Sequence, residues 1–278
     1  MNTSYSFLMS VYFKEKPKQL QFAIESMLNQ TISPTEIVIV KDGHLTDELN
    51  NVIDNYAKKY ISLFKVIQLE KNAGLGIALQ KGILECSNEF IARMDSDDYS
   101  HPNRIEKQLL EFEKDPELCV CGCFENGFEN DVSNTIWVHT VPQYNESIFN
   151  YMQKRCAMLH PTLVYKKSVI IEIGNYNDVP LFEDYDLLIR LVKNKKKCYN
   201  IQEGLYSIRI DTSFYKRRSG IHYLKKSYLF RMKYFKQGFF SLHDLIIAGG
   251  FQAFVCIMPI FIVKFIYEKL LRKRKDML

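Results

Sequence analysis

Three carboxylates fall within four residues in the run Met94-Asp95-Ser96-Asp97-Asp98. They follow Glu89–Met94, an apolar stretch that is typical of a strand. Like charges this close repel one another, and a hard divalent cation that also binds phosphate oxygens would relieve the repulsion. A solvated acidic turn ahead of a helix that begins near Pro102 would explain the same residues without a ligand. The cluster therefore predicts either a metal–phosphate site or such a turn.

Two more acidic positions follow predicted strands or precede predicted helices. Asp42 comes directly after Glu36–Val40, where its carboxylate could accept hydrogen bonds from a nucleobase imide or a ribose. Asp-Gly is also favoured turn chemistry. Asp184 lies in Phe182-Glu183-Asp184-Tyr185-Asp186, just ahead of a helical run. It is either a general base at a helix N-terminus or a residue that stabilises the first turn of the helix.

Two further motifs could contact phosphate. His160-Pro161 offers an imidazole for a metal or phosphate contact, although a lone histidine can equally be a packed side chain. The run Asn72-Ala73-Gly74-Leu75-Gly76 opens a predicted helix, so its backbone amides could approach a phosphate. It is not G-x-G-x-x-G and does not follow the first strand, which argues against a dinucleotide site.

The elements around these residues alternate between short β-branched runs and amphipathic stretches. The predicted strands are Phe7–Tyr12, Glu36–Val40, Phe64–Leu69 and Glu89–Met94, and the predicted helices are Pro17–Gln30, Thr46–Tyr60 and Gly74–Cys86. This order predicts an α/β fold with a mostly parallel central sheet flanked by helices. Ligands of such sheets bind outside the carboxyl ends of the strands. That rule selects Ser10–Lys16, Lys41–Gly43 and Asp95–Asp98.

The composition is that of a globular protein with a sizeable core: 278 residues, 47% hydrophobic and 25% charged. Seven cysteines are an odd number, and Met1–Gln30 lacks the pattern of a signal peptide, so we expect a reducing, cytoplasmic setting. Cys119, Cys121 and Cys123 alternate along a predicted strand. Their spacing places them on one face of that strand, and it differs from the spacing of a zinc site.

The C-terminal part differs in charge from the rest. From Thr212 to Leu278 there are 14 Lys and Arg against three acidic residues, so this segment carries about +11 and the remainder about −6. We expect a catalytic domain over 1–215 and a helical, membrane-associating tail over 216–278. Basic and apolar residues are combined over Ser219–Phe240, which predicts an amphipathic basic helix. We expect it to bind an anionic membrane surface, although a tail folded back onto the catalytic domain is the alternative.

An apolar run follows this helix at Leu245–Val263 and is roughly long enough to span a bilayer. It is interrupted by Gly249, Gly250, Gln252 and Pro259. A full span would place the basic residues near the C-terminus outside, against the positive-inside tendency. Those residues are Lys269, Arg272, Lys273, Arg274 and Lys275. We therefore expect an in-plane or re-entrant segment rather than a transmembrane helix.

Taken in order, the motifs resemble family 2 glycosyltransferases of the GT-A fold, similar to those that build bacterial exopolysaccharide, capsule and O-antigen repeats. The resemblance extends from about Phe7 to Leu191. The matching pieces are Leu8-Met9-Ser10-Val11-Tyr12, Ser26-Met27-Leu28-Asn29-Gln30-Thr31, Glu36-Ile37-Val38-Ile39-Val40-Lys41-Asp42-Gly43, Asn72-Ala73-Gly74-Leu75-Gly76, Arg93-Met94-Asp95-Ser96-Asp97-Asp98, His160-Pro161 and Glu183-Asp184-Tyr185-Asp186.

The resemblance implies a role for each motif. The residues that it assigns to the nucleotide sugar are Val11, Tyr12, Glu15, Asp42, Gly74, Asp95, Asp97 and His160. Asp97 and Asp98 would hold Mn²⁺ or Mg²⁺, and Asp184 would be the base that deprotonates the acceptor hydroxyl. Lys41 departs from the acidic residue that is common at its position, which leaves the contacts to the nucleobase open.

The implied reaction is inverting transfer from a nucleotide-diphosphate sugar, a UDP-sugar, to a saccharide acceptor linked to polyprenyl diphosphate. It would take place at the inner face of the cytoplasmic membrane, in surface polysaccharide biosynthesis. One carboxylate then suffices as base, whereas a hydrolase needs a second carboxylate across the scissile bond.

Three other classes of protein compete with this interpretation. A nucleotidyltransferase would show a Gly-rich loop after the first strand, but Ser10–Lys16 contains no glycine. A non-catalytic membrane-docking protein has no use for acidic residues along one sheet edge. A nucleic-acid binder fits the charge of the tail alone, so we expect no nucleic-acid partner.

Overall fold

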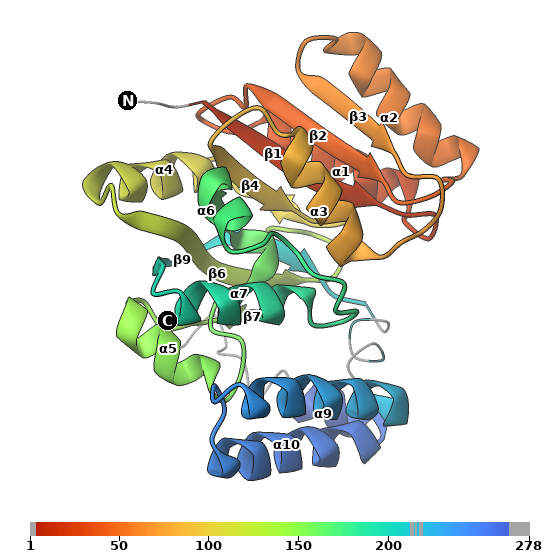
Figure 1. Cartoon of the computed structure of the whole chain (residues 1–278). Helices are drawn as coiled ribbons and strands as arrows, with labels where there is room; N and C mark the ends of the chain where they lie inside the picture. The colour runs from red at the N-terminus through yellow and green to blue at the C-terminus, as the bar shows by residue number, and fades with distance from the viewer. Residues whose placement is uncertain (1–3, 212–213, 215, 217–218, 267–278) are drawn as a thin grey trace.

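The computed structural model describes residues 4–211, 214, 216 and 219–266. Within them a nine-stranded mixed sheet has the order β3-β2-β1-β4-β8-β6-β9-β5, with β7 paired to β6 (Figure 1). The strands are β1 (Tyr5–Val11), β2 (Glu36–Lys41), β3 (Phe64–Gln68), β4 (Phe90–Met94), β5 (Tyr99–Ser100), β6 (Leu118–Phe128), β7 (Trp137–His139), β8 (Val164–Lys166) and β9 (Lys197–Arg209).

Helices connect most of these strands. They are α1 (Pro17–Leu28), α2 (Asp47–Lys59), α3 (Leu75–Glu85), α4 (Arg104–Lys114), α5 (Asn145–Met152), the 3-10 helix η1 (His160–Thr162), α6 (Lys167–Glu172), α7 (Glu183–Lys193), α9 (Gly220–Lys236), α10 (Leu242–Ile257) and α11 (Ile260–Phe265). The strands and helices predicted as far as Met94 are all confirmed, with ends that differ by no more than two residues. Thr46 caps α2 by accepting a hydrogen bond from the Leu49 amide at 3.4 Å.

The strand directions bring the carboxyl ends of several strands to one edge. β1 lies parallel to β2 and β4, and β2 lies parallel to β3. β8 is antiparallel to both β4 and β6, so β6 runs in the same direction as β4, and β9 is parallel to β6. The prediction of a mostly parallel sheet is therefore confirmed, and the segments after β1, β2 and β4 meet at this edge.

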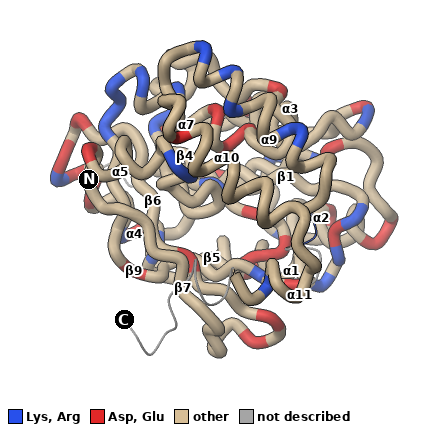
Figure 2. Tube along the Cα trace, turned by 90° about the horizontal axis from the view of Figure 1, so that it is seen from below, with Lys and Arg blue, Asp and Glu red and all other residues tan. Residues whose placement is uncertain are grey.

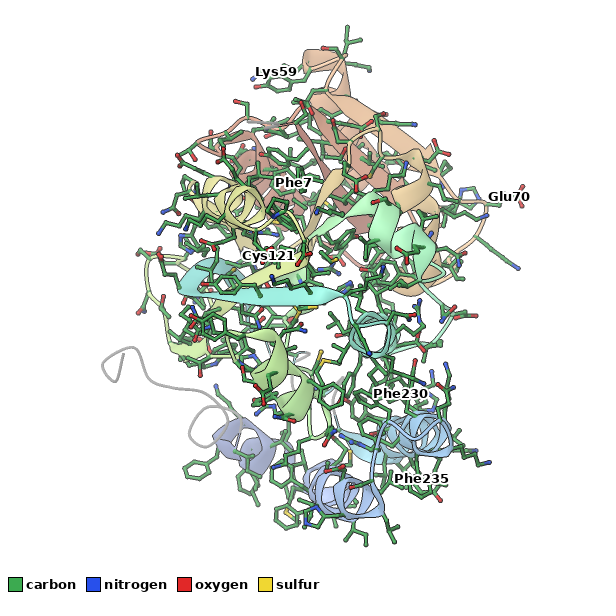
Figure 3. The ribbon with its side chains drawn as sticks, turned by 60° about the vertical axis from the view of Figure 1, so that its left-hand side comes forward. Phe7, Lys59, Glu70, Cys121, Phe230 and Phe235 are labelled. Atoms are coloured by element: carbon green, nitrogen blue, oxygen red, sulfur yellow. The ribbon has the colours of Figure 1, made fainter. Side chains whose placement is uncertain are left out.

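Two apolar layers cover the faces of the sheet. One face packs against α1, α2 and α4, and the other packs against α3, α6 and α7, with α5 and α9 farther along the same side. Phe7 and Cys121 lie in the interior of this sandwich, whereas Lys59 and Glu70 lie at its periphery (Figure 3).

The prediction that the three clustered cysteines share one face is wrong for Cys119. Cys121 and Cys123 are buried on the face of α1 and α4, but Cys119 packs on the opposite side. A register shift between Leu118 and Val120 in the pairing with β9 is the cause. An irregularity of this kind inserts a residue and turns the side chains before it to the other face.

The C-terminal helices form a layer at one end of the molecule. In Figure 1, α9 and α10 lie side by side at the end remote from α2 and β3. Pro259 separates α10 from α11. Among the described residues, no helix combines the length and apolar content that crossing a membrane requires. The predicted domain boundary falls at Tyr215, and the basic run 269–275 follows α11; both lie outside the described residues.

One basic residue of the predicted amphipathic helix is buried. α9 is helical as expected, and Tyr228 and Leu229 are exposed, but Arg231 is buried. The reason is tertiary packing. Arg231 donates a hydrogen bond to the carbonyl of Lys154 at 3.0 Å and lies over the ring of Phe240. The pattern of charged and apolar residues along the helix does not predict that Arg231 is buried.

Candidate active site

The acidic turn after β4 is held by the end of β9. The Asp98 side chain is buried, and its two oxygens accept hydrogen bonds from the Tyr206 hydroxyl at 3.0 Å and the Arg209 amide at 2.8 Å. Arg209 Nε also donates to the Asp97 carbonyl at 3.0 Å. Burial, together with the charges of Asp97 and Asp95, raises the pKa of Asp98 well above its usual value.

A buried arginine lies beneath this turn. Arg93 is the penultimate residue of β4, and its guanidinium forms an ion pair with Asp95. Asp95 itself is half-buried at the sheet edge. The ion pair orients Asp95 and compensates the charge of that carboxylate.

His160 begins a 3-10 helix and is buried close to Arg93. Its Nε2 lies 2.6 Å from the hydroxyl of Tyr176. Burial, followed by the nearby charge of Arg93, lowers the pKa of His160 well below its usual value, so the imidazole is neutral near pH 7. The structure therefore places His160 in a packed pair behind the edge of the sheet, between β4 and the loop before α7.

The first turn of α7 carries the candidate base. Asp184 is half-buried, and its Oδ1 accepts a hydrogen bond from the Tyr185 amide at 2.7 Å. Burial first, and then the charge of Asp184, raise the pKa of the neighbouring Glu183 to about 7. The N-cap residue of α7, Phe182, makes no side-chain capping hydrogen bond. Asp184 thus contributes to the helix start as the capping alternative expects, and it also stands beside a second carboxylate.

Asp42 and the Asn72–Gly76 segment meet in the structure. The buried Asp42 carboxylate accepts hydrogen bonds from the Ala73 amide at 2.7 Å, the Gly74 amide at 3.0 Å and Asn72 Nδ2 at 3.1 Å. Gly43 has φ of +83°, and a Cβ there would lie 2.4 Å from the Asn72 amide nitrogen, so the close approach requires glycine. The amides expected to face a phosphate are therefore directed at Asp42.

The remaining predicted pocket residues lie at the end of β1 and in the loop that follows it. Val11 is buried, whereas Tyr12 and Glu15 are half-buried. The Val11 carbonyl accepts the Asp42 amide at 2.8 Å, which joins the ends of β1 and β2. The side chain of Lys41 contacts α2: its Nζ lies 2.9 Å from Asn50 Oδ1 and 3.5 Å from Asp54 Oδ1.

The acidic turn has a donor set that suits a divalent metal bound together with a phosphate. No group of three His, Cys, Asp or Glu side chains within the described part of the chain forms a metal cage. Mg²⁺ and Mn²⁺ accept carboxylate oxygens, and a site shared with phosphate needs only one or two of them from the protein. Asp97 is half-buried at the edge, and each Asp98 oxygen has a second lone pair. These residues fit such an ion.

Several residues of this site escaped the sequence reasoning. Tyr206 and Arg209 hold the acidic turn from β9, more than a hundred positions away along the chain. Arg93 stood inside a recognised motif, but nothing in its spacing showed that it would be buried. Gly76 does not approach a ligand: a Cβ there would lie 3.2 Å from Glu183 Cβ, so this glycine lets α3 and α7 approach each other.

Comparisons with known proteins agree with this geometry. The profile described as Glycosyl transferase family 2 matches residues 6–174. The UDP-Gal:alpha-D-GlcNAc-diphosphoundecaprenol beta-1,3-galactosyltransferase of Escherichia coli is 33% identical over 269 residues, which covers 97% of both chains. The amylovoran biosynthesis glycosyltransferase AmsE of Erwinia amylovora is 32% identical, covering 95% of this chain and 98% of the relative.

A solved structure supports the fold. The mannosyltransferase PcManGT from Pyrobaculum calidifontis, in complex with GDP-Man and Mn²⁺, matches with a TM-score of 0.63 at 11% identity, covering 90% of this chain and 69% of that one. The expected GT-A fold is confirmed. A nucleotidyltransferase and a non-catalytic docking protein are no longer needed as alternatives, because the sequence matches extend over nearly the whole chain. The chain is a glycosyltransferase and belongs to glycosyl transferase family 2.

Proposed function

We propose that the enzyme transfers a sugar from a UDP-sugar to a saccharide acceptor linked to polyprenyl diphosphate, with inversion of the anomeric configuration. The galactosyltransferase relative has a name that specifies a UDP-sugar donor and a diphosphoundecaprenol-linked acceptor. The amylovoran relative acts in polysaccharide biosynthesis. Both cover nearly the full chain, which supports the same class of donor, acceptor and pathway here.

One observation supports the proposal most strongly: the end of β4 is linked to the first turn of α7 through the His160–Tyr176 pair. The Arg93 amide donates to the Leu163 carbonyl just after η1 at 2.8 Å. His160 of η1 pairs with the Tyr176 hydroxyl at 2.6 Å, and the adjacent Asn177 donates to Asp186 of α7 at 2.8 Å. Arg93 in turn pairs with Asp95. The acidic turn and the candidate base therefore flank one small region, as a transfer between a diphosphate donor and a hydroxyl acceptor requires.

The proposed chemical step is a single displacement. The acceptor oxygen forms a bond to the anomeric carbon of the donor sugar, and the bond between that carbon and the β-phosphate oxygen breaks. The acceptor proton passes to the Asp184 carboxylate, and the electron pair of the broken bond leaves with the nucleoside diphosphate. Attack from the face opposite the leaving group inverts the configuration, and one carboxylate is sufficient as base.

Asp97 and Asp98 are the proposed ligands of Mn²⁺ or Mg²⁺, which would neutralise charge on the departing diphosphate when bound. Asp95, Val11, Tyr12 and Glu15 belong to the proposed nucleotide pocket. Asp42 shapes this pocket through the 72–74 loop, and any contact it makes to the nucleobase would add to the three hydrogen bonds it already accepts. Gly74 and His160 are proposed to border the diphosphate.

We also propose that the C-terminal helices rest on the inner face of the cytoplasmic membrane. α10 has almost no charged residue along its length (Figure 2). Its exposed apolar side chains are Leu242, Ile246, Ile247, Phe251, Phe254 and Ile257. An apolar helix surface next to a strongly basic segment is typical of interfacial binding to anionic lipid.

The test is a screen of UDP-sugars with a diphosphoundecaprenol-linked saccharide as acceptor, in which UDP release and glycolipid product are both measured. We expect acceptor-dependent UDP release with at least one UDP-sugar in the presence of Mn²⁺ or Mg²⁺. Release that is equal with and without acceptor for every donor would contradict the proposed acceptor class.

A further inference from the structure

We propose that Asp186 is a positioning residue through which α9 fixes the first turn of α7, so that the C-terminal helix is part of the catalytic apparatus. This inference rests on the proposed role of Asp184 as base. It assigns to α9 a function in the chemical step that is separate from any contact with a membrane.

The two faces of this turn have different neighbours. Phe182 stacks on Phe230 of α9 with centroids 4.9 Å apart and an interplanar angle of 17°. Tyr185 lies 5.3 Å from the same ring. Phe182, Tyr185 and Asp186 thus face α9, as positions i, i+3 and i+4 of a helix should. Glu183 is directed elsewhere, against Gly76 of α3.

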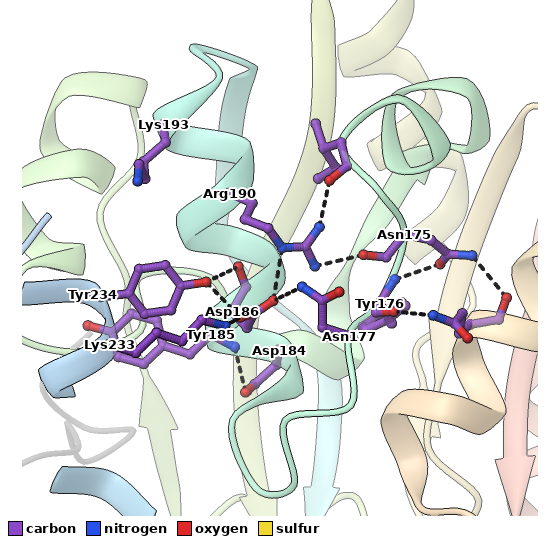
Figure 4. Close-up of polar contacts among 12 residues, drawn as sticks. Asn175, Tyr176, Asn177, Asp184, Tyr185, Asp186, Arg190, Lys193, Lys233 and Tyr234 are labelled. Atoms are coloured by element: carbon purple, nitrogen blue, oxygen red, sulfur yellow. Dashed lines mark hydrogen bonds and ion pairs between the residues drawn. The ribbon is translucent and has the colours of Figure 1, made fainter. Parts of the chain in front are cut away.

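Asp186 is the polar centre of this interface (Figure 4). Its side chain is fully buried. Its Oδ2 accepts hydrogen bonds from Arg190 Nε at 2.9 Å and Asn177 Nδ2 at 2.8 Å, both from α7 or the loop before it. Its Oδ1 accepts hydrogen bonds from Lys233 Nζ at 2.8 Å and the Tyr234 hydroxyl at 2.6 Å. One oxygen is therefore held locally, while the other is held by α9.

The loop before α7 is fastened to the same group. Arg190 reaches past Asp186 to the carbonyls of Ile173 at 2.8 Å and Asn175 at 2.7 Å. Asn175 in turn donates to the carbonyl of Gln80 in α3 at 3.0 Å. A shift of Asp186 would therefore move both the helix that carries Asp184 and the loop that carries Tyr176.

The N-cap residue Phe182 supplies no side-chain hydrogen bond to the first turn of α7. Asp184 accepts the Tyr185 amide at 2.7 Å, and the contacts of Asp186 with α9 add support to a helix start that lacks an N-cap. A buried carboxylate that loses its donors must find water or protonate. Either change would displace Asp184, and a displacement of about 1 Å at a reacting group can reduce the rate about 10²-fold.

The experiment uses the full-length chain with Lys233→Met, Tyr234→Phe and the double variant. These substitutions remove the two donors to Oδ1 but keep most of the side-chain volume. Matched controls on the same helix are Lys236→Met and Tyr228→Phe, since Lys236 is exposed and Tyr228 is 61% exposed. Asp184→Asn is measured in parallel. Thermal unfolding of each variant sets an assay temperature at which all are folded.

We expect the double variant to lose at least about tenfold in kcat, since two hydrogen bonds to a charged group are removed. The donor KM should stay within about twofold. Lys233→Arg keeps a positively charged donor, so it should retain most of the kcat that Lys233→Met loses. Wild-type kcat in the double variant, or parallel losses of kcat and donor affinity, would overturn the positioning role. If that occurred while Asp184→Asn was inactive, the proposed function would stand. Full activity of Asp184→Asn would instead rule out both Asp184 as the base and Asp186 as the residue that positions it.

Discussion

The hydroxyl of Tyr206 on β9 lies between two parts of the acidic turn: it donates to Asp98 Oδ2 at 3.0 Å and accepts from the Asp95 amide at 3.1 Å. Tyr206→Phe removes both hydrogen bonds without changing the packing of the ring. Because these bonds orient the carboxylates, we expect kcat/KM for the donor to fall about tenfold, as loss of about 1.5 kcal/mol implies.

The matched control for this variant is Tyr199→Phe, on the same strand. The Tyr199 hydroxyl accepts from Gln143 at 2.8 Å, away from the acidic turn. Tyr199→Phe should therefore leave kcat/KM near the wild-type value. A Tyr206→Phe enzyme with kcat/KM no lower than the control would show that Tyr206 does not support the turn during the reaction.

Metal dependence is the second prediction. Asp97→Asn and Asp98→Asn keep the side-chain volume but remove charge, so each should abolish most transfer while leaving thermal unfolding cooperative. Treatment with a chelator should likewise stop transfer, and added Mn²⁺ or Mg²⁺ should restore it. Calorimetric titration of Mn²⁺ in the presence of UDP gives a readout that is independent of turnover. Undiminished transfer after chelation would rule out the assigned role of the ion.

The sequence predicted the strands, helices and acidic motifs of the first hundred residues well, because hydrophobic periodicity and local turn chemistry determine them. It also placed Asp42, Asp95 and Asp184 after or before the correct elements. It missed Tyr206 and Asp186 as structural partners because each acts through residues distant in the chain. Arg93 pairs with the nearby Asp95, but its burial depends on tertiary packing that the local sequence does not specify. The burial of Arg231 in α9 was missed for the same reason: its contacts with Lys154 and Phe240 do not follow from the periodicity of the helix.

The third prediction concerns pH. Burial and the charge of Asp184 raise the pKa of Glu183 from 4.5 to about 7. The folded state therefore binds this proton more tightly than the unfolded state, and the stability that the group contributes is present below pH 4.5 and lost as the pH rises toward 7. In Glu183→Gln this titration is absent. The Tm of the wild type should therefore fall relative to the variant across this range, and parallel Tm curves would contradict the assignment.

The fourth prediction concerns the exposed apolar face of α10. Ile247 and Ile257 are 55% and 69% exposed, so replacing both by serine should cost little stability but remove apolar area from a membrane contact. We expect binding to vesicles that contain phosphatidylglycerol to weaken by about tenfold or more in sedimentation assays at low salt. Ile61→Ser, at an 83% exposed position after α2, serves as the control. Equal binding of wild type and double variant would refute a membrane role for this face.

Asp184 is the proposed base that takes the proton of the acceptor hydroxyl in a single displacement. The most direct measurement compares single-turnover transfer and donor binding in the wild type and Asp184→Asn, because the carboxamide occupies the same space but cannot take a proton. We expect Asp184→Asn to transfer at a rate lower by about 10²–10⁴-fold, with a donor Kd within about twofold of the wild type. The wild-type product should have an inverted anomeric centre. Equal losses of rate and donor affinity would assign Asp184 to the helix start alone, and retained configuration would contradict the single displacement.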